Sequence, residues 1–153
     1  MEHLVYTDKK SNVLDKILSG EKTMIVRGAA GRKMPHSRVF KGETLYFVEN
    51  DGSCQIKAKA VVKDVFNSEK MTEDESTAIL ESKQEQLQLS AAQKKRWYGK
   101  KVLCLVTIEN PEAIEPMTYD RQKNMDDWLI VEDIKDIIVG GNAQDYKNIR
   151  LKN

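Results

Sequence analysis

The stretch LSGEKTMIVR at positions 18–27 decides how the first part of this chain folds. The residues before and within it repeat apolar side chains at helical spacing: Val13, Leu14, Ile17 and Leu18. We predict a short helix over residues 11–18, with Ser11 able to cap its start and Gly20 able to end it. A strand over residues 22–27 is expected to follow at once, because β-branched residues are frequent there.

The side chains of this strand are expected to alternate between two faces. One face would carry Thr23, Ile25 and Arg27, and the other Lys22, Met24 and Val26. Because Lys22 shares its face with apolar residues and lies beside the carboxyl end of a helix, we expect it to point into a cleft. Two interpretations of this lysine stay open: a functional group in the cleft, or a side chain that only caps the helix.

The rest of the chain contains further strand-like runs and two helices. Strand-like composition marks residues 44–49, 54–66 and 102–108. Two capping boxes, Thr72 with Glu75 and Ser90 with Gln93, predict two helices between the second and third of these runs. A last apolar segment covers residues 134–139.

Length and element order predict a single α+β domain over residues 1–141, followed by a polar tail or short surface helix at 142–153. The domain would be a small β-barrel of about five to six strands flanked by about two to four helices. No apolar run approaches the ~20 residues of a membrane span, and the first residues lack a secretory signal. A cytoplasmic location is therefore expected.

The two cysteines, Cys54 and Cys104, each lie inside a strand-like run. We expect buried free thiols, and a redox pair is the alternative. Only His3 and His36 are available as companions, so no metal site and no cofactor are predicted.

The net charge of +1 hides a segregation of charge along the chain. Residues 9–41 carry nine bases and two acids, and residues 94–108 carry five bases and no acid. Residues 42–93 carry five bases and ten acids, and residues 109–136 carry three bases and nine acids. Such blocks form one positive and one negative face if they stay apart in space, or cancel if they interleave.

The order of these pieces resembles the ASCH pattern of the PUA-like superfamily. The matching pieces are residues 18–27, the segment FKGETLYF at 40–47 and the strand at 56–65, within a match that covers roughly residues 11–108. The resemblance implies a PUA-like pseudobarrel with a cleft beside the first helix. It also implies binding of RNA or nucleotides, and some members act as ribonucleases or as amidohydrolases on acetylated cytidine.

The resemblance also implies roles for particular residues. Lys22 matches the lysine that the amidohydrolase group uses in catalysis, whereas Ile25 stands where that group has its threonine nucleophile. The acid expected by this resemblance follows the long strand: Glu69, Glu73 or Glu75. If the protein is an enzyme, the catalytic candidates are Lys22, Thr23 and Glu73.

A basic, glycine-containing loop, GAAGRKMP at positions 28–35, follows the first strand. Glycine lets backbone N–H groups approach an anion, and Arg32, Lys33 and Arg38 add positive charge. The GxxG spelling occurs in the phosphate clamp of KH domains, but those loops join two helices, and this one follows a strand. A phosphate-facing loop is predicted, and a merely solvated connection is the alternative.

Aromatic residues interrupt two charged segments further along. In KKRWYGKK at 94–101, Trp97 or Tyr98 can stack on a base, although a tryptophan at a helix end more often packs in the core. In Asp126-Asp127-Trp128, the acids and the tryptophan can line a cleft opposite the cations. The alternative is a buried Trp128 with two solvated acids.

The predicted function is binding of RNA, of another single-stranded nucleic acid or of a nucleoside or nucleotide, in a basic cleft beside the first helix. The candidate contacts are Lys22, Arg27, Arg32, Lys33, Arg38, Trp97, Tyr98, Asp127 and Trp128. The alternatives are a hydrolase on nucleotide-type substrates and a protein-interaction domain that uses the acidic residues 109–136.

Overall fold

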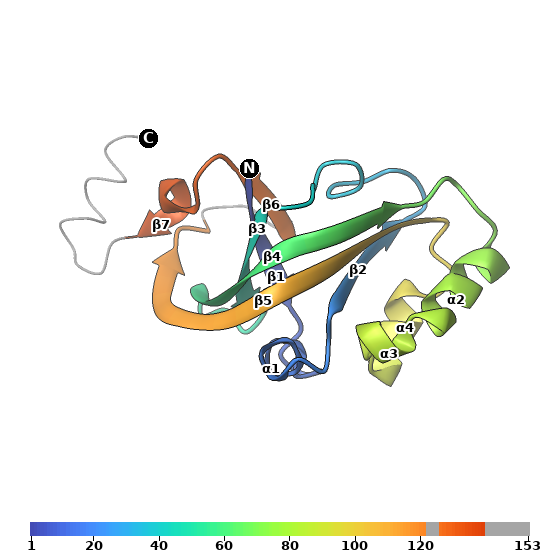
Figure 1. Cartoon of the computed structure of the whole chain (residues 1–153), viewed down its shortest axis with the longest axis horizontal. Coiled ribbons are helices and arrows are strands. Elements are labelled where there is room, and N and C mark those ends of the chain that lie inside the picture. The colour runs from blue at the N-terminus through green and yellow to red at the C-terminus, as the bar shows by residue number, and fades with distance from the viewer. Residues whose placement is uncertain (122–125, 140–153) are drawn as a thin grey trace.

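The computed structural model describes residues 1–121 and 126–139, which form a curled half-barrel sheet with helices packed against it (Figure 1). The strands are β1 (Glu2–Thr7), β2 (Met24–Ala29), β3 (Thr44–Glu49), β4 (Gln55–Asn67), β5 (Val102–Tyr119), β6 (Trp128–Val131) and β7 (Ile138–Val139). They lie in the order β2-β5-β4-β3-β1-β6, and β7 pairs with β5. This is the predicted α+β class, with seven strands among the described residues where five to six were expected.

The helices of the described residues are α1 (Val13–Ser19), α2 (Glu73–Ser82), α3 (Gln84–Leu87) and α4 (Ala91–Trp97). A 3-10 helix, η1 (Ile134–Ile137), precedes β7. Helices α2, α3 and α4 lie together near one end of the long strands β4 and β5 (Figure 1). Both predicted capping boxes are present, Thr72 with Glu75 and Ser90 with Gln93. Within the described ranges, every helix is too short or too polar to cross a membrane.

Strand β2 divides its side chains between two core clusters. Ile25 joins the cluster enclosed by the curled sheet, which includes Trp128. Met24 and Val26 join the cluster between the sheet and helices α2 to α4, which includes Trp97. The strand begins at Met24 and not at Lys22 as predicted, and the predicted alternation is confirmed for Met24, Ile25 and Val26.

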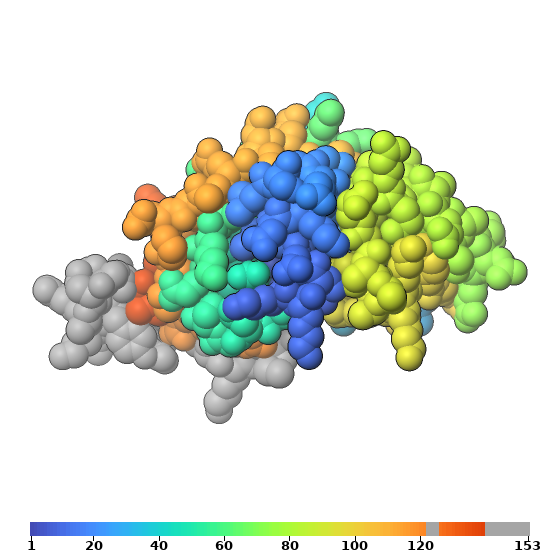
Figure 2. Space-filling view, turned by 90° about the horizontal axis from the view of Figure 1, so that it is seen from below, coloured from blue at the N-terminus to red at the C-terminus, as the bar shows by residue number. Residues whose placement is uncertain are grey.

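Helix α1 begins later than predicted. Its N-cap is Asn12, whereas the hydroxyl of Ser11 lies 2.8 Å from Asp8 Oδ2 and 2.8 Å from the hydroxyl of Ser90. Ser11 thus ties the start of α1 to the start of α4, and the N-terminal segment lies beside the helices in the space-filling view (Figure 2). Gly20 ends the helix as predicted, with a φ of 84° that suits glycine.

Strand β5 is longer than the predicted run at 102–108, because it continues through Pro111 and Pro116 to Tyr119. Proline has no N–H for a sheet ladder, which is why the prediction stopped before these residues. The pairing of β4 with β5 shifts register at both places, so bulges leave each proline without a partner in the ladder. The predicted apolar segment at 134–139 is η1 followed by β7.

Strands β1 and β6 were not predicted. They pair with each other at one edge of the sheet, and β1 also pairs in parallel with β3. Cys54 and Cys104 are free thiols, but Cys54 is only partly buried. The predicted tail at 142–153 lies outside the described residues.

Candidate functional site

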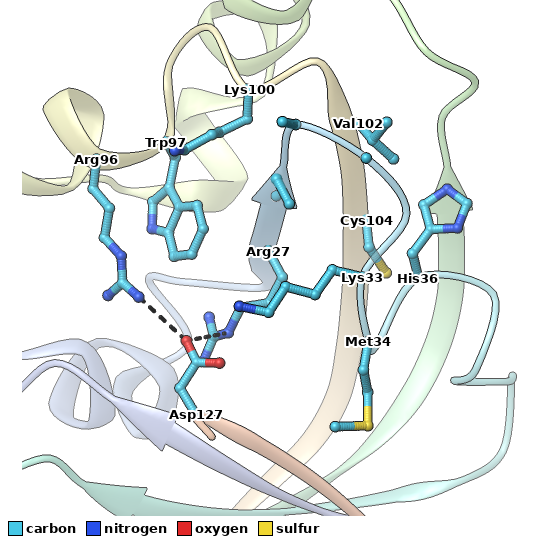
Figure 3. Close-up of a pocket in the computed structure, with 14 residues that line it drawn as sticks. Arg27, Lys33, Met34, His36, Arg96, Trp97, Lys100, Val102, Cys104 and Asp127 are labelled. Atoms are coloured by element: carbon cyan, nitrogen blue, oxygen red, sulfur yellow. Dashed lines mark hydrogen bonds and ion pairs between the residues drawn. The ribbon is translucent and has the colours of Figure 1, made fainter. Parts of the chain in front are cut away.

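Two hollows open where β2, the loop after it, α4 and the residue before β6 come together. The larger has a volume of about 290 Å³. Its charged lining consists of Arg27, Lys33, Arg96, Lys100 and Asp127, and we call it the cationic hollow. The close-up shows Arg27, Lys33, Arg96 and Asp127 pointing towards one another from separate segments of the chain, with the Lys100 side chain beside Trp97 (Figure 3).

Arg27 is the fixed centre of this hollow. Its guanidinium donates to the carbonyl of Val26 at 2.9 Å and to that of Tyr6 at 2.7 Å. Its Cζ lies 5.8 Å from the ring centre of Trp97 and 5.5 Å from that of Trp128. Two carbonyls and two indole rings thus hold the guanidinium in one orientation.

Asp127 joins Arg27 to Arg96. Its Oδ2 lies 3.4 Å from Arg27 Nε, as an ion pair without hydrogen-bond geometry, and accepts a hydrogen bond of 3.3 Å from Arg96 (Figure 3). Arg96 also covers the ring of Trp97, with its Cζ 4.3 Å from the ring centre. Burial lowers the pKa of Arg27, and the Asp127 carboxylate acts in the opposite direction. One carboxylate faces two guanidinium groups, so positive charge is in excess.

The second hollow has a volume of about 250 Å³. It shares four lining residues with the first: Arg27, Arg96, Trp97 and Asp127. These four residues form the boundary between the two hollows. Its other polar lining residues include Lys22, Asp8, Asn50 and Gln93, and we call it the polar hollow.

Lys22 lines the polar hollow although the residue is only 3% exposed. Its ammonium donates to the carbonyl of Leu87 at the end of α3, while its backbone N–H donates to the Lys16 carbonyl of α1 at 3.0 Å. Burial lowers the pKa of Lys22 to about 7, and the charges of Arg27 and Lys16 add to this effect. Near neutral pH the amine therefore exists in both protonation states.

The backbone of residues 28–31 forms one wall of the cationic hollow. A Cβ placed on Gly28 would lie 3.0 Å from Leu103 Cδ2 and 3.0 Å from Lys100 Cβ. A Cβ on Gly31 would meet open space. A side chain at position 28 would therefore crowd the start of β5, whereas one at position 31 would not.

His36 also lines this hollow, but both of its ring nitrogens have partners. Nε2 lies 2.8 Å from the Ser68 carbonyl, and Nδ1 lies 2.9 Å from the Ser37 hydroxyl. A carbonyl only accepts, so Nε2 carries the proton and Ser37 donates to Nδ1. His36 therefore fixes the loop to the segment after β4.

The two hollows contain five of the nine predicted contacts: Lys22, Arg27, Lys33, Trp97 and Asp127. Arg32, Arg38, Tyr98 and Trp128 line neither hollow. Arg32 is exposed and pairs with Glu69 at 3.4 Å. Trp128 is only 1% exposed, and its ring packs against the guanidinium of Arg27.

The catalytic candidates are not gathered in one place. Lys22 lines the polar hollow, whereas Thr23 and Glu73 line neither hollow. The backbone of Thr23 pairs with Gln86 and Ile108, at the junction between α1 and β2. Glu73 is exposed at the start of α2, close to Gly99.

Sequence reasoning missed several lining residues. Arg96 and Lys100 belong to the basic segment at 94–101, but the pattern did not show which of its cations face inwards. Asn50 was not singled out, and Gln93 was assigned only to a helix cap. Gln93 does serve the cap, because its Oε1 accepts from the Ser90 N–H at 3.1 Å, and it lines the polar hollow as well.

No family model and no curated protein matches this sequence. Among solved structures, ASCH from Zymomonas mobilis aligns with a TM-score of 0.62 and 11% identity, over 99% of this chain and 94% of that one. A variant of that protein aligns with a TM-score of 0.62 and 11% identity, over 98% and 96% of the two chains. A second variant gives a TM-score of 0.59 and 12% identity, over 99% and 95%. The chain therefore has the ASCH fold, as its sequence pattern predicted.

Proposed function

We propose that this protein binds single-stranded RNA or a related single-stranded nucleic acid, with a phosphate in the cationic hollow. The observation that carries the proposal is the arrangement of Arg27, Lys33, Arg96 and Lys100 around one space of about 290 Å³. Asp127 is the one carboxylate among the described residues that line it, and it already has two arginine partners. An excess of positive charge is the condition for attracting a phosphodiester.

The shape and size of the hollow support a nucleotide-sized anion. Its volume is close to the lower limit of about 300 Å³ for small-molecule sites. The backbone of residues 28–31 lines it without bulky side chains, which allows close approach of an anion. The resemblance of residues 11–108 to the ASCH pattern supports the same class of ligand.

Fluorescence anisotropy with a labelled single-stranded RNA tests this proposal. Lys33→Ala and Lys100→Ala each remove one cation from the hollow, and each is expected to weaken binding by about three- to tenfold at low salt. Lys63→Ala is the matched control, because Lys63 is exposed on β4 and lines neither hollow. If all three variants lose affinity equally, or none does, the phosphate is not bound in the cationic hollow.

Lys22 supports a second candidate function, hydrolysis of a nucleotide-type substrate. An amine with a pKa of about 7 can accept a proton at neutral pH, as a general base does. The assay incubates the protein with RNA and with acetylated cytidine at several pH values. A rate that rises as Lys22 loses its proton near pH 7 supports this function. Product formation no greater than that of Lys22→Ala rules it out.

A further inference from the structure

The two hollows meet at a shared boundary but differ in chemistry. The cationic hollow has four cations and one carboxylate in its lining. The polar hollow has three basic residues, Lys22 and the two shared arginines, against two carboxylates, Asp8 and Asp127, so its excess of positive charge is smaller. It also has the side-chain amides of Asn50 and Gln93. One side therefore suits an anion, and the other suits a neutral group that both donates and accepts hydrogen bonds.

The polar hollow has the features of a site for a nucleobase. Ile25, Val26 and Leu89 give it an apolar wall. The Oε1 of Gln93 is held by the Ser90 N–H at 3.1 Å, and among the described residues the amide hydrogens on Nε2 have no partner. The Asp8 carboxylate also lines it: Oδ1 accepts from the Lys10 N–H at 3.2 Å, and Oδ2 accepts from the Ser11 hydroxyl at 2.8 Å and keeps a second lone pair for a ligand. An exposed base edge carries both donors and acceptors, so it matches this lining.

The boundary between the hollows has a fixed half and a movable half. Arg27 is held by two backbone carbonyls and two indole rings. The Arg96 side chain is 60% exposed, and its partners are Asp127 at 3.3 Å and the ring of Trp97. A phosphate in the cationic hollow competes with Asp127 for Arg96 without disturbing Arg27.

We propose that the two hollows bind two parts of one nucleotide, the phosphate in the cationic hollow and its base in the polar hollow, with Arg96 turning from Asp127 to the phosphate. This rests on the proposed function and names the ligand more narrowly. A free nucleoside fills only the polar hollow, and a sugar phosphate fills only the cationic hollow. Joining the two parts makes the second contact intramolecular, so the nucleotide binds more tightly than either part.

Two alanines allow each hollow to be filled separately. Ala92 is exposed on α4 and lines the polar hollow, and Ala30 is exposed in the loop and lines the cationic hollow. Leucine at either position fills part of one hollow and removes no existing hydrogen bond. Ala92→Leu and Ala30→Leu are therefore matched variants that differ in which hollow they close.

The experiment is an NMR titration of the full chain with the four common ribonucleoside monophosphates, their nucleosides and ribose 5-phosphate, up to about 10 mM ligand. The indole N–H of Trp97 reports on the shared boundary. We expect at least one nucleotide to bind about tenfold more tightly than its nucleoside and than ribose 5-phosphate. Ala92→Leu should weaken the binding of nucleotide and nucleoside but leave the binding of ribose 5-phosphate unchanged. Ala30→Leu should weaken the binding of nucleotide and ribose 5-phosphate but leave the binding of nucleoside unchanged.

The inference would be overturned if nucleotide and nucleoside bind with equal affinity, or if both variants lose affinity equally for every ligand. It would also be overturned if no nucleotide binds in this concentration range. RNA binding by the same variants separates this failure from that of the proposed function. Suppose that Lys33→Ala weakens RNA binding while Ala92→Leu leaves RNA and nucleotide binding unchanged. The base then does not bind in the polar hollow, and the proposed function stands. If Lys33→Ala and Lys100→Ala bind RNA normally, the proposed function fails as well.

Discussion

The Oδ2 atom of Asp127 lies 3.4 Å from Nε of Arg27, and this ion pair connects the residue before β6 to the strand β2. Asp127→Asn removes the one negative charge from the described lining of the cationic hollow. We expect affinity for single-stranded RNA to rise by about three- to tenfold at low salt, because a nearby charge changes anion binding by about 1 kcal/mol or more. The melting temperature should fall, because the buried Arg27 loses its counter-charge.

Anisotropy and thermal denaturation of Asp127→Asn check both effects, with Glu109→Gln on the exposed part of β5 as a charge-matched control. Weaker RNA binding by Asp127→Asn would contradict the role of Asp127 as a negative charge that opposes anion binding. It would mean that the carboxylate contacts the ligand instead of balancing the arginines.

The two glycines of the loop should respond differently to alanine. Gly28→Ala places a methyl group 3.0 Å from side-chain atoms of Leu103 and Lys100, and crowding of this kind costs about 1–3 kcal/mol. Gly31→Ala meets no atom within 4 Å and should leave the free energy of unfolding unchanged or raise it by about 0.4–1 kcal/mol. Urea denaturation measures both. Equal stability of the two variants would show that β2 and β5 have room for a side chain at position 28.

His3 should make stability depend on pH. It is fully buried, and Trp128 Nε1 donates to its Nδ1 at 3.0 Å, so the proton of the neutral ring lies on Nε2, 2.9 Å from Glu43. Burial lowers the pKa of His3 from 6.5, so on acidification the unfolded chain takes up a proton before the folded one does. The free energy of unfolding should therefore fall below about pH 6.5, by at most about 1.4 kcal/mol per pH unit.

Denaturation of the wild type and of His3→Asn from about pH 8 to about pH 5 isolates this effect. Asparagine keeps an acceptor for Trp128 but does not titrate in this range. The difference in unfolding free energy between the two proteins should change in favour of His3→Asn as the pH falls. A difference that stays constant with pH would contradict the lowered pKa of His3.

Lys22→Met should stabilise the protein most at low pH. The pKa of Lys22 is about 7 in the folded state and 10.5 for an exposed lysine, so below pH 7 the fold bears the full cost of a buried ammonium. Between these two values the unfolded chain alone holds the proton, and wild-type stability rises with pH. The advantage of Lys22→Met should therefore shrink from pH 7 towards pH 10.5, as measured by urea denaturation. An advantage that grows with pH would exclude a buried ammonium.

Local patterns predicted the elements that depend on neighbouring residues. The alternation in β4 puts Ile56, Ala58, Ala60 and Val62 in the core, and both capping boxes start helices. The same reasoning failed at Ser11, because its hydroxyl pairs with Ser90, which is 79 residues away in the chain. It also failed at Pro111 and Pro116, because bulges that depend on the partner strand accommodate both.

The candidate site also combines residues that local sequence patterns indicate with residues that only the folded structure brings together. Arg27 and Lys33, which line the cationic hollow, could be predicted as candidates because a basic residue at a strand end and a basic loop are visible in sequence. The boundary formed by Arg96 and Asp127 depends on α4 and the residue before β6 meeting in space, which no spacing along the chain shows. Lys22 was expected to meet the end of α1, but its ammonium reaches α3 instead, because the second core cluster brings Leu87 to the start of β2.

The salt dependence of RNA affinity tests the central claim most directly. Each phosphate contact on a single strand contributes about 0.7 to the slope of log affinity against log salt concentration. The double variant Lys33→Ala/Lys100→Ala should therefore have a slope smaller by about 1.4 than the wild type, while Lys63→Ala keeps the wild-type slope. A double variant with the same slope as the wild type would show that the nucleic acid backbone does not enter the cationic hollow.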